Sequence, residues 1–266
     1  MGHFDEAEDP RRRILIKALA AGLFSTALPE RAALASSFFG SVPGKLPAGQ
    51  SIYRINGTAT VNGKAATLQT RINPGDTVET GKDSEIIFVV NGNNSMILRA
   101  NSHLVIETPH KPQVQAPSQP NPQAAHEAEQ NGFGSLLVSG LRLLSGKLLS
   151  VSRNTPMQVN TVNATIGIRG TGFYVESDPG QTYFCTCYGT TDVAAAHDPA
   201  SRETVTSTHS HHPLYIVNDG GQGRNIRNAP FINHTDQELE LIEALVGRTP
   251  PFVFAKDDYT APRRDY

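Results

Sequence analysis

Two cysteines and a group of histidines are the residues of this chain best suited to binding a metal ion. Cys185 and Cys187 are its only cysteines, and His209, His211 and His212 follow within a short stretch. Thiolate sulfur and imidazole nitrogen are the ligands that zinc and copper ions prefer in proteins. If the two segments pair as antiparallel strands, sulfur and nitrogen atoms meet on one face of a sheet.

The segments around these residues have the composition of a β-hairpin. Tyr183–Val193 and Arg202–Thr208 are rich in Tyr, Phe, Thr and Val, which favour strands. Pro199 lies between them and cannot continue a central strand, so it predicts a turn. The hairpin, with the residues that follow it, spans residues 183–213.

A turn centred at Asp198 predicts the register of this hairpin. With that centre, Cys187 lies opposite His209. The same register places Cys185 opposite His211, and directly opposed residues have Cβ atoms about 4.5–5.5 Å apart. Four ligands would then surround one pocket.

A turn centred half a residue later gives a different ligand set. Cys185 would then lie opposite His212, and Cys187 opposite Ser210, which removes one ligand. In the first register, His212 ends its strand and could bend toward the site as a substitute. His234, just before a predicted helix, is a further candidate ligand.

The residue types leave the metal open. Two Cys and two His suit Zn²⁺ or copper, or a [2Fe–2S] cluster with sulfur ligands on one iron and nitrogen ligands on the other. The spacing C-x-C with H-x-H is not the Rieske motif. A disulfide between Cys185 and Cys187 is disfavoured, because alternate Cβ atoms on a strand lie about 6–7 Å apart and a disulfide needs about 3.5–4.5 Å.

No sequence motif of a common enzyme class is present. The chain contains no G-x-S-x-G, no H-E-x-x-H and no Walker loop. A catalytic thiol usually lies at a helix N-terminus, whereas this cysteine pair lies within a predicted strand. We therefore expect a protein that is not an enzyme, with redox activity as the remaining catalytic option. The isolated His103, His126 and His197 are expected to be exposed and without a role.

The N-terminal residues predict export. Residues 12–17 read Arg-Arg-Ile-Leu-Ile-Lys, which is close to the twin-arginine export pattern, and an apolar stretch, Ala18–Leu28, follows. Ala33-Leu34-Ala35 has the small residues of a cleavage site. We expect residues 1–35 to be a signal peptide and the mature protein to be soluble in the periplasm, with no membrane span.

Charge and turn residues limit the remaining classes. The net charge is −2, and the expected signal peptide removes equal numbers of basic and acidic residues. The mature chain therefore has no basic excess with which to bind nucleic acid or anionic lipid. With 23 Gly, 18 Pro and no Trp, the chain is rich in turns.

Short alternating segments predict an all-β fold of antiparallel strands with one short C-terminal helix. Asn56-Gly57 and Asn62-Gly63 are hairpin-turn signals between such segments. Besides the hairpin above, the expected strands are Ser51–Arg54, Thr58–Val61, Ala66–Thr70, Thr77–Thr80, Glu85–Val90, Ser95–Arg99, His103–Glu107, Leu136–Leu144, Leu148–Ser152, Met157–Thr161 and Gly172–Glu176.

Two regions differ from this pattern. Residues 109–132 are rich in Pro and Gln and almost without apolar residues, so we expect a disordered insertion. Thr235-Asp236-Gln237-Glu238 fits a capping box, and the apolar residues that follow have helical spacing up to Gly247. The β domain is thus expected at 36–232, and the helix with its tail at 233–266.

The middle of the chain resembles a FecR domain. The resemblance is carried by Pro74–Gly81, Ser84–Val90, Ser95–Leu98, Leu141–Leu149 and Val159–Phe173. Its most recognisable part is Arg169-Gly170-Thr171 with Phe173, and it covers roughly Ser51–Val193. It implies a β-sandwich or solenoid-like fold and a periplasmic sensing role, here as a stand-alone module.

The glycines of this motif have a physical interpretation. Gly167, Gly170 and Gly172 permit a positive φ or the close approach of a neighbour, and Arg169 can anchor nearby carbonyl groups. Their spacing is not a dinucleotide-binding fingerprint.

The sequence thus predicts an exported FecR-like sensing or binding module with a Cys2His2 metal or iron–sulfur site. One alternative is a periplasmic electron carrier or redox protein. Another is a metal-free structural module that binds an envelope protein partner through its strand edges. The oligomeric state is left open.

Overall fold

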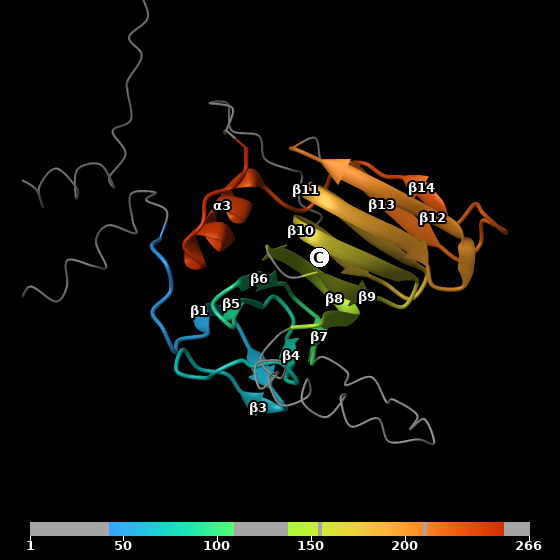
Figure 1. The fold of residues 1–266 in the computed structure, drawn as a ribbon. Coiled ribbons are helices and arrows are strands. Elements are labelled where there is room, and N and C mark those ends of the chain that lie inside the picture. The colour runs from blue at the N-terminus through green and yellow to red at the C-terminus, as the bar shows by residue number, and fades with distance from the viewer. Residues whose placement is uncertain (1–42, 109–137, 154–155, 210–211, 253–266) are drawn as a thin grey trace, which may run out of the picture. The chain divides into compact units, whose positions relative to one another are not determined.

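A computed structural model describes residues 43–108, 138–153, 156–209 and 212–252. The expected signal peptide (1–35), the insertion (109–132) and His211 lie outside these residues. The described residues form fourteen strands in one hydrogen-bonded sheet and one helix, α3 (Asp236–Leu245), which confirms the predicted all-β class (Figure 1). Among these residues, no helix has the length and apolar character needed to cross a membrane.

The strands vary in length from two residues to fifteen. They are β1 (Ile52–Asn56), β2 (Ala59–Val61), β3 (Lys64–Ala65), β4 (Thr77–Thr80), β5 (Glu85–Val90), β6 (Asn94–Leu98), β7 (His103–Glu107), β8 (Gly140–Ser152), β9 (Met157–Asn160), β10 (Ala164–Ser177), β11 (Gln181–Ala195), β12 (Asp198–Ser207), β13 (His212–Val217) and β14 (Ile226–Asn228).

Three long strands divide the sheet into two connected parts. β8 pairs with β7 and β9 in its first half and with β6 and β10 in its second. Along the chain, β10 pairs first with β9 and then with β8. In the same way, β11 pairs first with β13 and then with β12. One part therefore runs β1-β5-β6-β8-β10-β11-β13-β14. The other runs β3-β2-β4-β7-β8-β9-β10-β11-β12.

Two apolar clusters stabilise this arrangement, and strand alternation separates them. The inner cluster draws side chains from both parts of the sheet, including Phe88, Leu104, Phe173 and Val205. The outer cluster lies under α3 and consists of Ile87, Val89, Ile97, Leu149, Val151, Tyr174, Tyr183, Cys185, Cys187, Tyr188, Ile232, Leu239, Ile242, Leu245 and Val246.

Helix α3 begins and ends where the sequence predicts. Thr235 is the N-cap, and its side chain and that of Glu238 form a reciprocal capping box. Gly247 follows the C-cap with a φ of 73°, the conformation that glycine adopts without strain. The apolar positions of the helix face the sheet, so α3 covers the outer cluster.

Several strand boundaries differ from expectation. Ala66–Thr70 forms turns instead of a strand. Residues 140–144 and 148–152, expected in two strands, lie in one strand, because Gly146 adopts a φ of 89° and lets β8 continue past an irregularity in its pairing. β13 and β14 were not expected. Pro213 lies near the start of β13, a position at which a strand tolerates proline.

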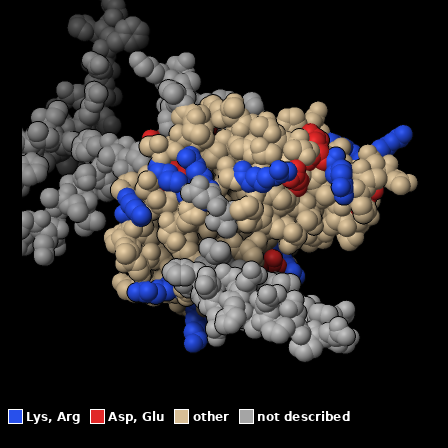
Figure 2. Space-filling model, in the orientation of Figure 1, with Lys and Arg blue, Asp and Glu red and all other residues tan. Residues whose placement is uncertain are grey.

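Charged side chains on the face drawn in Figure 2 lie in separate groups among uncharged residues. Among the described residues, ion pairs at the surface include Arg54 with Glu85 and Arg142 with Glu107. Such exposed pairs contribute little to stability.

Candidate metal centre

The two cysteines lie side by side on one face of β11. Because alternate residues of a strand point to the same face, Cys185 and Cys187 both face the layer beneath α3. Both are fully buried, and both carry thiols instead of a disulfide. Their sulfur atoms therefore sit in an apolar layer closed to solvent.

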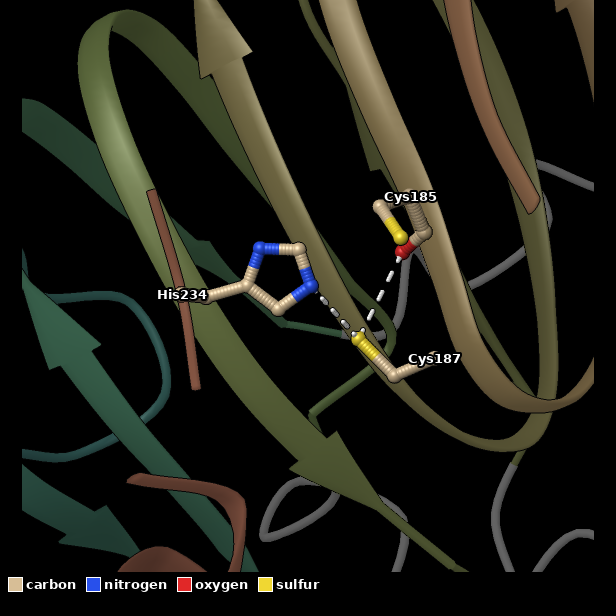
Figure 3. A group of neighbouring side chains, drawn as sticks. All are labelled: Cys185, Cys187 and His234. Carbon is tan, nitrogen blue, oxygen red and sulfur yellow. Dashed lines mark hydrogen bonds between the residues drawn. The ribbon is translucent and has the colours of Figure 1, made fainter. Parts of the chain in front are cut away.

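His234 approaches the cysteines from another element. It belongs to the segment that connects β14 to α3, directly before the N-cap Thr235, and its side chain is fully buried. The imidazole Nε2 atom lies 3.3 Å from the Cys187 Sγ atom (Figure 3). The Tyr174 ring stacks on the imidazole at 4.7 Å, and Phe231 contacts it edge-on at 4.4 Å. These rings fix the orientation of His234.

The contacts of His234 determine which ring nitrogen carries the proton. Nδ1 lies 2.8 Å from the backbone carbonyl oxygen of Ile232. A carbonyl only accepts hydrogen bonds, so Nδ1 must donate, and the Nε2 lone pair of the neutral ring then points at Cys187. Metal-binding histidines commonly show this arrangement, in which the second ring nitrogen donates to a carbonyl.

The three ligand atoms have the separation that one metal ion requires. Among the described residues, Cys185, Cys187 and His234 form a group whose ligand atoms all lie within 4.8 Å of one another. Bond lengths of about 2.3 Å for Zn–S and 2.0–2.1 Å for Zn–N place tetrahedral ligand atoms about 3.5–3.8 Å apart. Small side-chain movements would therefore bring all three atoms onto one ion.

Tyrosines and a buried carboxylate surround this group. Burial, and then the negative charge that Cys185 carries when it is ionised, raises the pKa of Tyr183 above its ordinary value. The neutral Tyr183 hydroxyl donates to the Pro230 carbonyl oxygen at 3.1 Å. Tyr174 donates to Glu176 at 2.9 Å, and the Asn233 side-chain amide donates to the same carboxylate at 2.5 Å.

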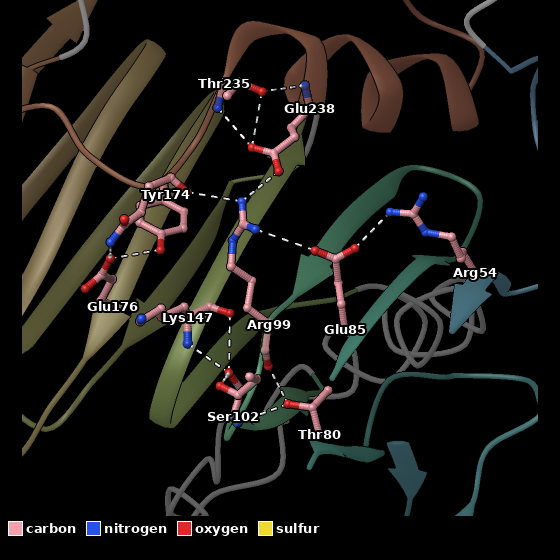
Figure 4. A network of polar contacts seen from close by, with 12 residues as sticks. Arg54, Thr80, Glu85, Arg99, Ser102, Lys147, Tyr174, Glu176, Thr235 and Glu238 are labelled. Atoms are coloured by element: carbon pink, nitrogen blue, oxygen red, sulfur yellow. Dashed lines mark hydrogen bonds and ion pairs between the residues drawn. The ribbon is translucent and has the colours of Figure 1, made fainter. Parts of the chain in front are cut away.

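A buried arginine connects the entry to α3 with the sheet. Arg99 is 4 % exposed and lies between the carboxylates of Glu238, at 2.8 Å, and Glu85, at 3.5 Å (Figure 4). It also donates to the Asn233 carbonyl oxygen at 3.1 Å, and its guanidinium lies 6.0 Å from the centre of the Tyr174 ring. Residues on both sides of His234 are therefore held by one cation.

The structure places two of the predicted histidine ligands, His209 and His212, beside carboxylates, and His211 lies outside the described residues. His209 Nε2 lies 2.9 Å from an oxygen of Asp236, and its ring stacks on Phe252 at 4.1 Å. His212 is half-exposed and lies 3.4 Å from Glu203.

The predicted register holds along only part of the hairpin. Gly189 pairs with Ser207 and Thr191 with Val205, as a turn centred at Asp198 predicts. Cys185, however, pairs with Pro213 and not with His211. The reason is that the part of β11 that contains Cys185 pairs with β13, whereas only its later part pairs with β12.

His234 was only a further candidate at the sequence level, because 47 residues separate it from Cys187. One feature of the sequence did point to His234. The residue before an N-cap lies at the entry of its helix, and an amphipathic helix must cover an apolar face. Docking α3 onto the face that carries the cysteines therefore brings its entry residue close to them.

One glycine of the FecR-like motif makes room for a side chain on the same face of the sheet. Gly170 has a φ of 63°, and Gly172 lies opposite Tyr188, whose ring occupies the space that a Cβ atom would need. This agrees with the predicted roles of these glycines. Arg169 differs, since its guanidinium donates to the Asp192 carboxylate at 3.1 Å instead of to backbone carbonyls.

Comparisons with known proteins identify no family. No family model matches the chain, and no curated protein matches it by sequence. Two solved structures from Parabacteroides distasonis, each described as a "putative anti-sigma factor", have TM-scores of 0.38. One is 10 % identical over 61 % of this chain and 70 % of its own, and the other 12 % identical over 70 % and 82 %. This likeness is too low to support a conclusion about fold or function, and the FecR resemblance stays a prediction.

Proposed function

We propose that the protein is an exported, non-catalytic sensing module that binds one thiophilic metal ion through Cys185, Cys187 and His234. The observation that carries the proposal is the convergence of three buried ligand atoms, with the His234 ring held by its Nδ1 hydrogen bond. The twin-arginine pattern and the FecR-like segment support the export and sensing parts. Both of these remain sequence-based expectations.

Charge balance favours Zn²⁺ as the ion. Two thiolates and a neutral imidazole around Zn²⁺ have no net charge, whereas the same ligands around Cu⁺ leave one negative charge. Burying an uncompensated charge is costly, and both cysteines and His234 are fully buried. A single ion also fits the short ligand separations better than a [2Fe–2S] cluster, whose ligands attach to two iron atoms.

The three described ligands leave one position of a tetrahedral ion for a further group. Structural zinc sites have four protein ligands, and sites that bind other molecules keep one position open. His211 lies outside the described residues and stays the remaining predicted ligand. Replacing His211 with Gln separates the two cases, because only a four-ligand site loses zinc affinity.

The metal content of protein purified after native export tests the proposal. We expect about one zinc per chain, and loss of this zinc in Cys185→Ser and in His234→Gln. His212→Gln is the matched control, since His212 is half-exposed beside Glu203. Unchanged zinc in both ligand variants would refute the site.

The same sample distinguishes the alternative functions. A thiolate-to-copper or thiolate-to-iron absorption band that responds to dithionite would favour an electron carrier. Metal-free protein of full stability would favour a structural envelope module. Replacing Arg12 and Arg13 together with Lys tests export, because twin-arginine transport depends on that pair; unchanged periplasmic protein would refute this part.

A further inference from the structure

We infer that metal occupancy controls how firmly the segment Ala229–Glu238, here called the entry segment, is held on the sheet. This inference rests on the proposed metal site. His234 lies within the entry segment, whereas Cys185 and Cys187 lie on β11. A bound ion would therefore cross-link the start of α3 to the centre of the sheet.

Without an ion, the side chain of His234 is held to the cysteines by a much weaker link. The Cys187 Sγ atom lies 3.3 Å from Nε2, within the distance of a hydrogen bond between sulfur and imidazole. Such a bond makes only a modest net contribution, whereas metal coordination by cysteine and histidine can supply most of the folding free energy of a small domain. Loss of the ion thus removes the strongest single constraint on this residue.

The backbone next to His234 is held by polar contacts. Asn233 has a φ of 64°, a left-handed conformation that asparagine tolerates better than most residues with a Cβ atom. Its side chain donates to the buried Glu176 carboxylate, and its carbonyl oxygen accepts from Arg99. These contacts keep Asn233 in this conformation. The ion adds a link at the next residue, so its loss loosens the entry segment beside them.

The far end of α3 is held independently of the metal. Glu243 is fully buried and lies 2.6 Å from Arg248 and 2.9 Å from Arg153. The backbone amide of Leu46 also donates to the Leu245 carbonyl oxygen at 2.9 Å. Opening would therefore be local and confined to the entry segment, as is common for the less stable parts of a folded domain.

Local opening would also change which apolar side chains are exposed at the protein surface. Ile232 is 8 % exposed and Leu239 is fully buried when the segment is docked. Release of the entry segment exposes Ile232 and loosens the first turn of α3. The metal state is thereby converted into a change of accessible apolar surface.

Hydrogen exchange followed by mass spectrometry on the full exported chain tests this inference. We compare zinc-loaded with chelator-treated protein and measure the zinc content of each sample. At a free zinc concentration of about 100 Kd, exchange that requires metal release should slow about 100-fold. We expect this in peptides covering 229–238, with little change in β13 or at residues 243–247.

Two variants extend the comparison. His234→Gln should give fast exchange at 229–238 with or without zinc; if this variant does not fold, the chelated wild type supplies the same comparison. Arg248→Gln is the matched control. It weakens the far end of α3 and should speed exchange at 243–247 while leaving the zinc-dependent ratio at 229–238 unchanged.

The outcomes separate this inference from the proposed function. Protein that binds zinc but exchanges at the same rate at 229–238 in both states overturns the inference and leaves the metal site intact. Equal slowing across the whole chain overturns it too, because the metal would then act on global stability. Protein that binds no zinc overturns the proposed function and the inference together.

Discussion

The inner and outer apolar clusters of this protein are built on different principles. The inner cluster consists of apolar side chains contributed by both parts of the sheet. The outer cluster contains the thiols and three tyrosines, and buried ionic groups lie beside it. Among the described residues, every buried Arg, Asp, Glu or His side chain belongs to, or contacts, residues 233–243; these are Arg99, Glu176, His234, Asp236 and Glu243.

The two clusters therefore have different effects: the inner cluster stabilises the fold, and the polar groups of the outer side position α3. Apolar burial is non-directional and proportional to area, so the inner cluster stabilises the sheet without selecting one exact arrangement. Hydrogen bonds and ion pairs are directional, and leaving one buried partner unsatisfied is costly. The polar groups of the outer side therefore fix where α3 and its entry segment lie, and with them the position of His234.

The largest effect is expected in the inner cluster. Phe173 is fully buried and stacks on Phe184 at a ring distance of 5.8 Å. Phe173→Ala should lower the free energy of unfolding by about 3–5 kcal/mol, because it removes apolar burial and leaves a cavity. Urea denaturation measures this. A loss of less than about 1 kcal/mol would contradict the assignment of this cluster as the stabilising core.

On the outer side, the largest effect is expected at Glu243. Burial, and then the neighbouring Glu243 carboxylate, raises the pKa of Tyr188, whose hydroxyl donates to that carboxylate. Glu243→Gln leaves two arginines facing a neutral group, which should cost about 3 kcal/mol in urea denaturation. Arg54→Ala is the control, because the exposed Arg54–Glu85 pair should contribute about 0–1 kcal/mol. Equal losses of unfolding free energy in both variants would show that the buried carboxylate and the exposed ion pair contribute equally.

A smaller effect is expected at the helix cap. Thr235→Ala removes the hydroxyl that accepts from the Glu238 amide at 3.2 Å, which should cost about 1 kcal/mol. Thermal unfolding of this variant can be compared with that of Thr190→Ala, which removes an exposed hydroxyl contact with Thr206. If both changes lower the melting temperature equally, the capping box does not determine the start of α3.

The smallest effect is expected where a surface carboxylate joins β12 to the loop between β13 and β14. Asp198 accepts from Ser201 at 2.6 Å, from the Gly223 amide at 2.7 Å and from Asn225 at 2.9 Å. These hydrogen bonds, that of Ser201 first, lower the pKa of Asp198 to about 2. The ionised carboxylate thus stabilises the folded state above its ordinary pKa, and this contribution disappears as the pH falls toward 2.

Asp198→Asn tests this pH dependence directly. The difference in melting temperature between wild type and variant should be largest near neutral pH and narrow as the pH falls from about 4 to about 2. A difference that stays constant over this range would show that the carboxylate charge has no part in holding this loop on β12.

The sequence by itself determined the local features. Alternation and Asn-Gly turns predicted the all-β class, and the turn at Asn62-Gly63 is found with both residues at positive φ. The capping box and apolar spacing predicted α3 closely. These features depend on residues within a few positions of one another, and local conformational preferences act over that range.

The tertiary structure alone decided which residues meet at the cysteines. That Cys185 and Cys187 share a face followed from strand alternation, but their neighbour is His234 and not the nearer His209 or His212. β11 exchanges one partner strand for another at this point, and the docking of α3 brings His234 from a distant part of the chain. Strand exchange and helix docking depend on the burial of whole faces, which no short sequence pattern encodes.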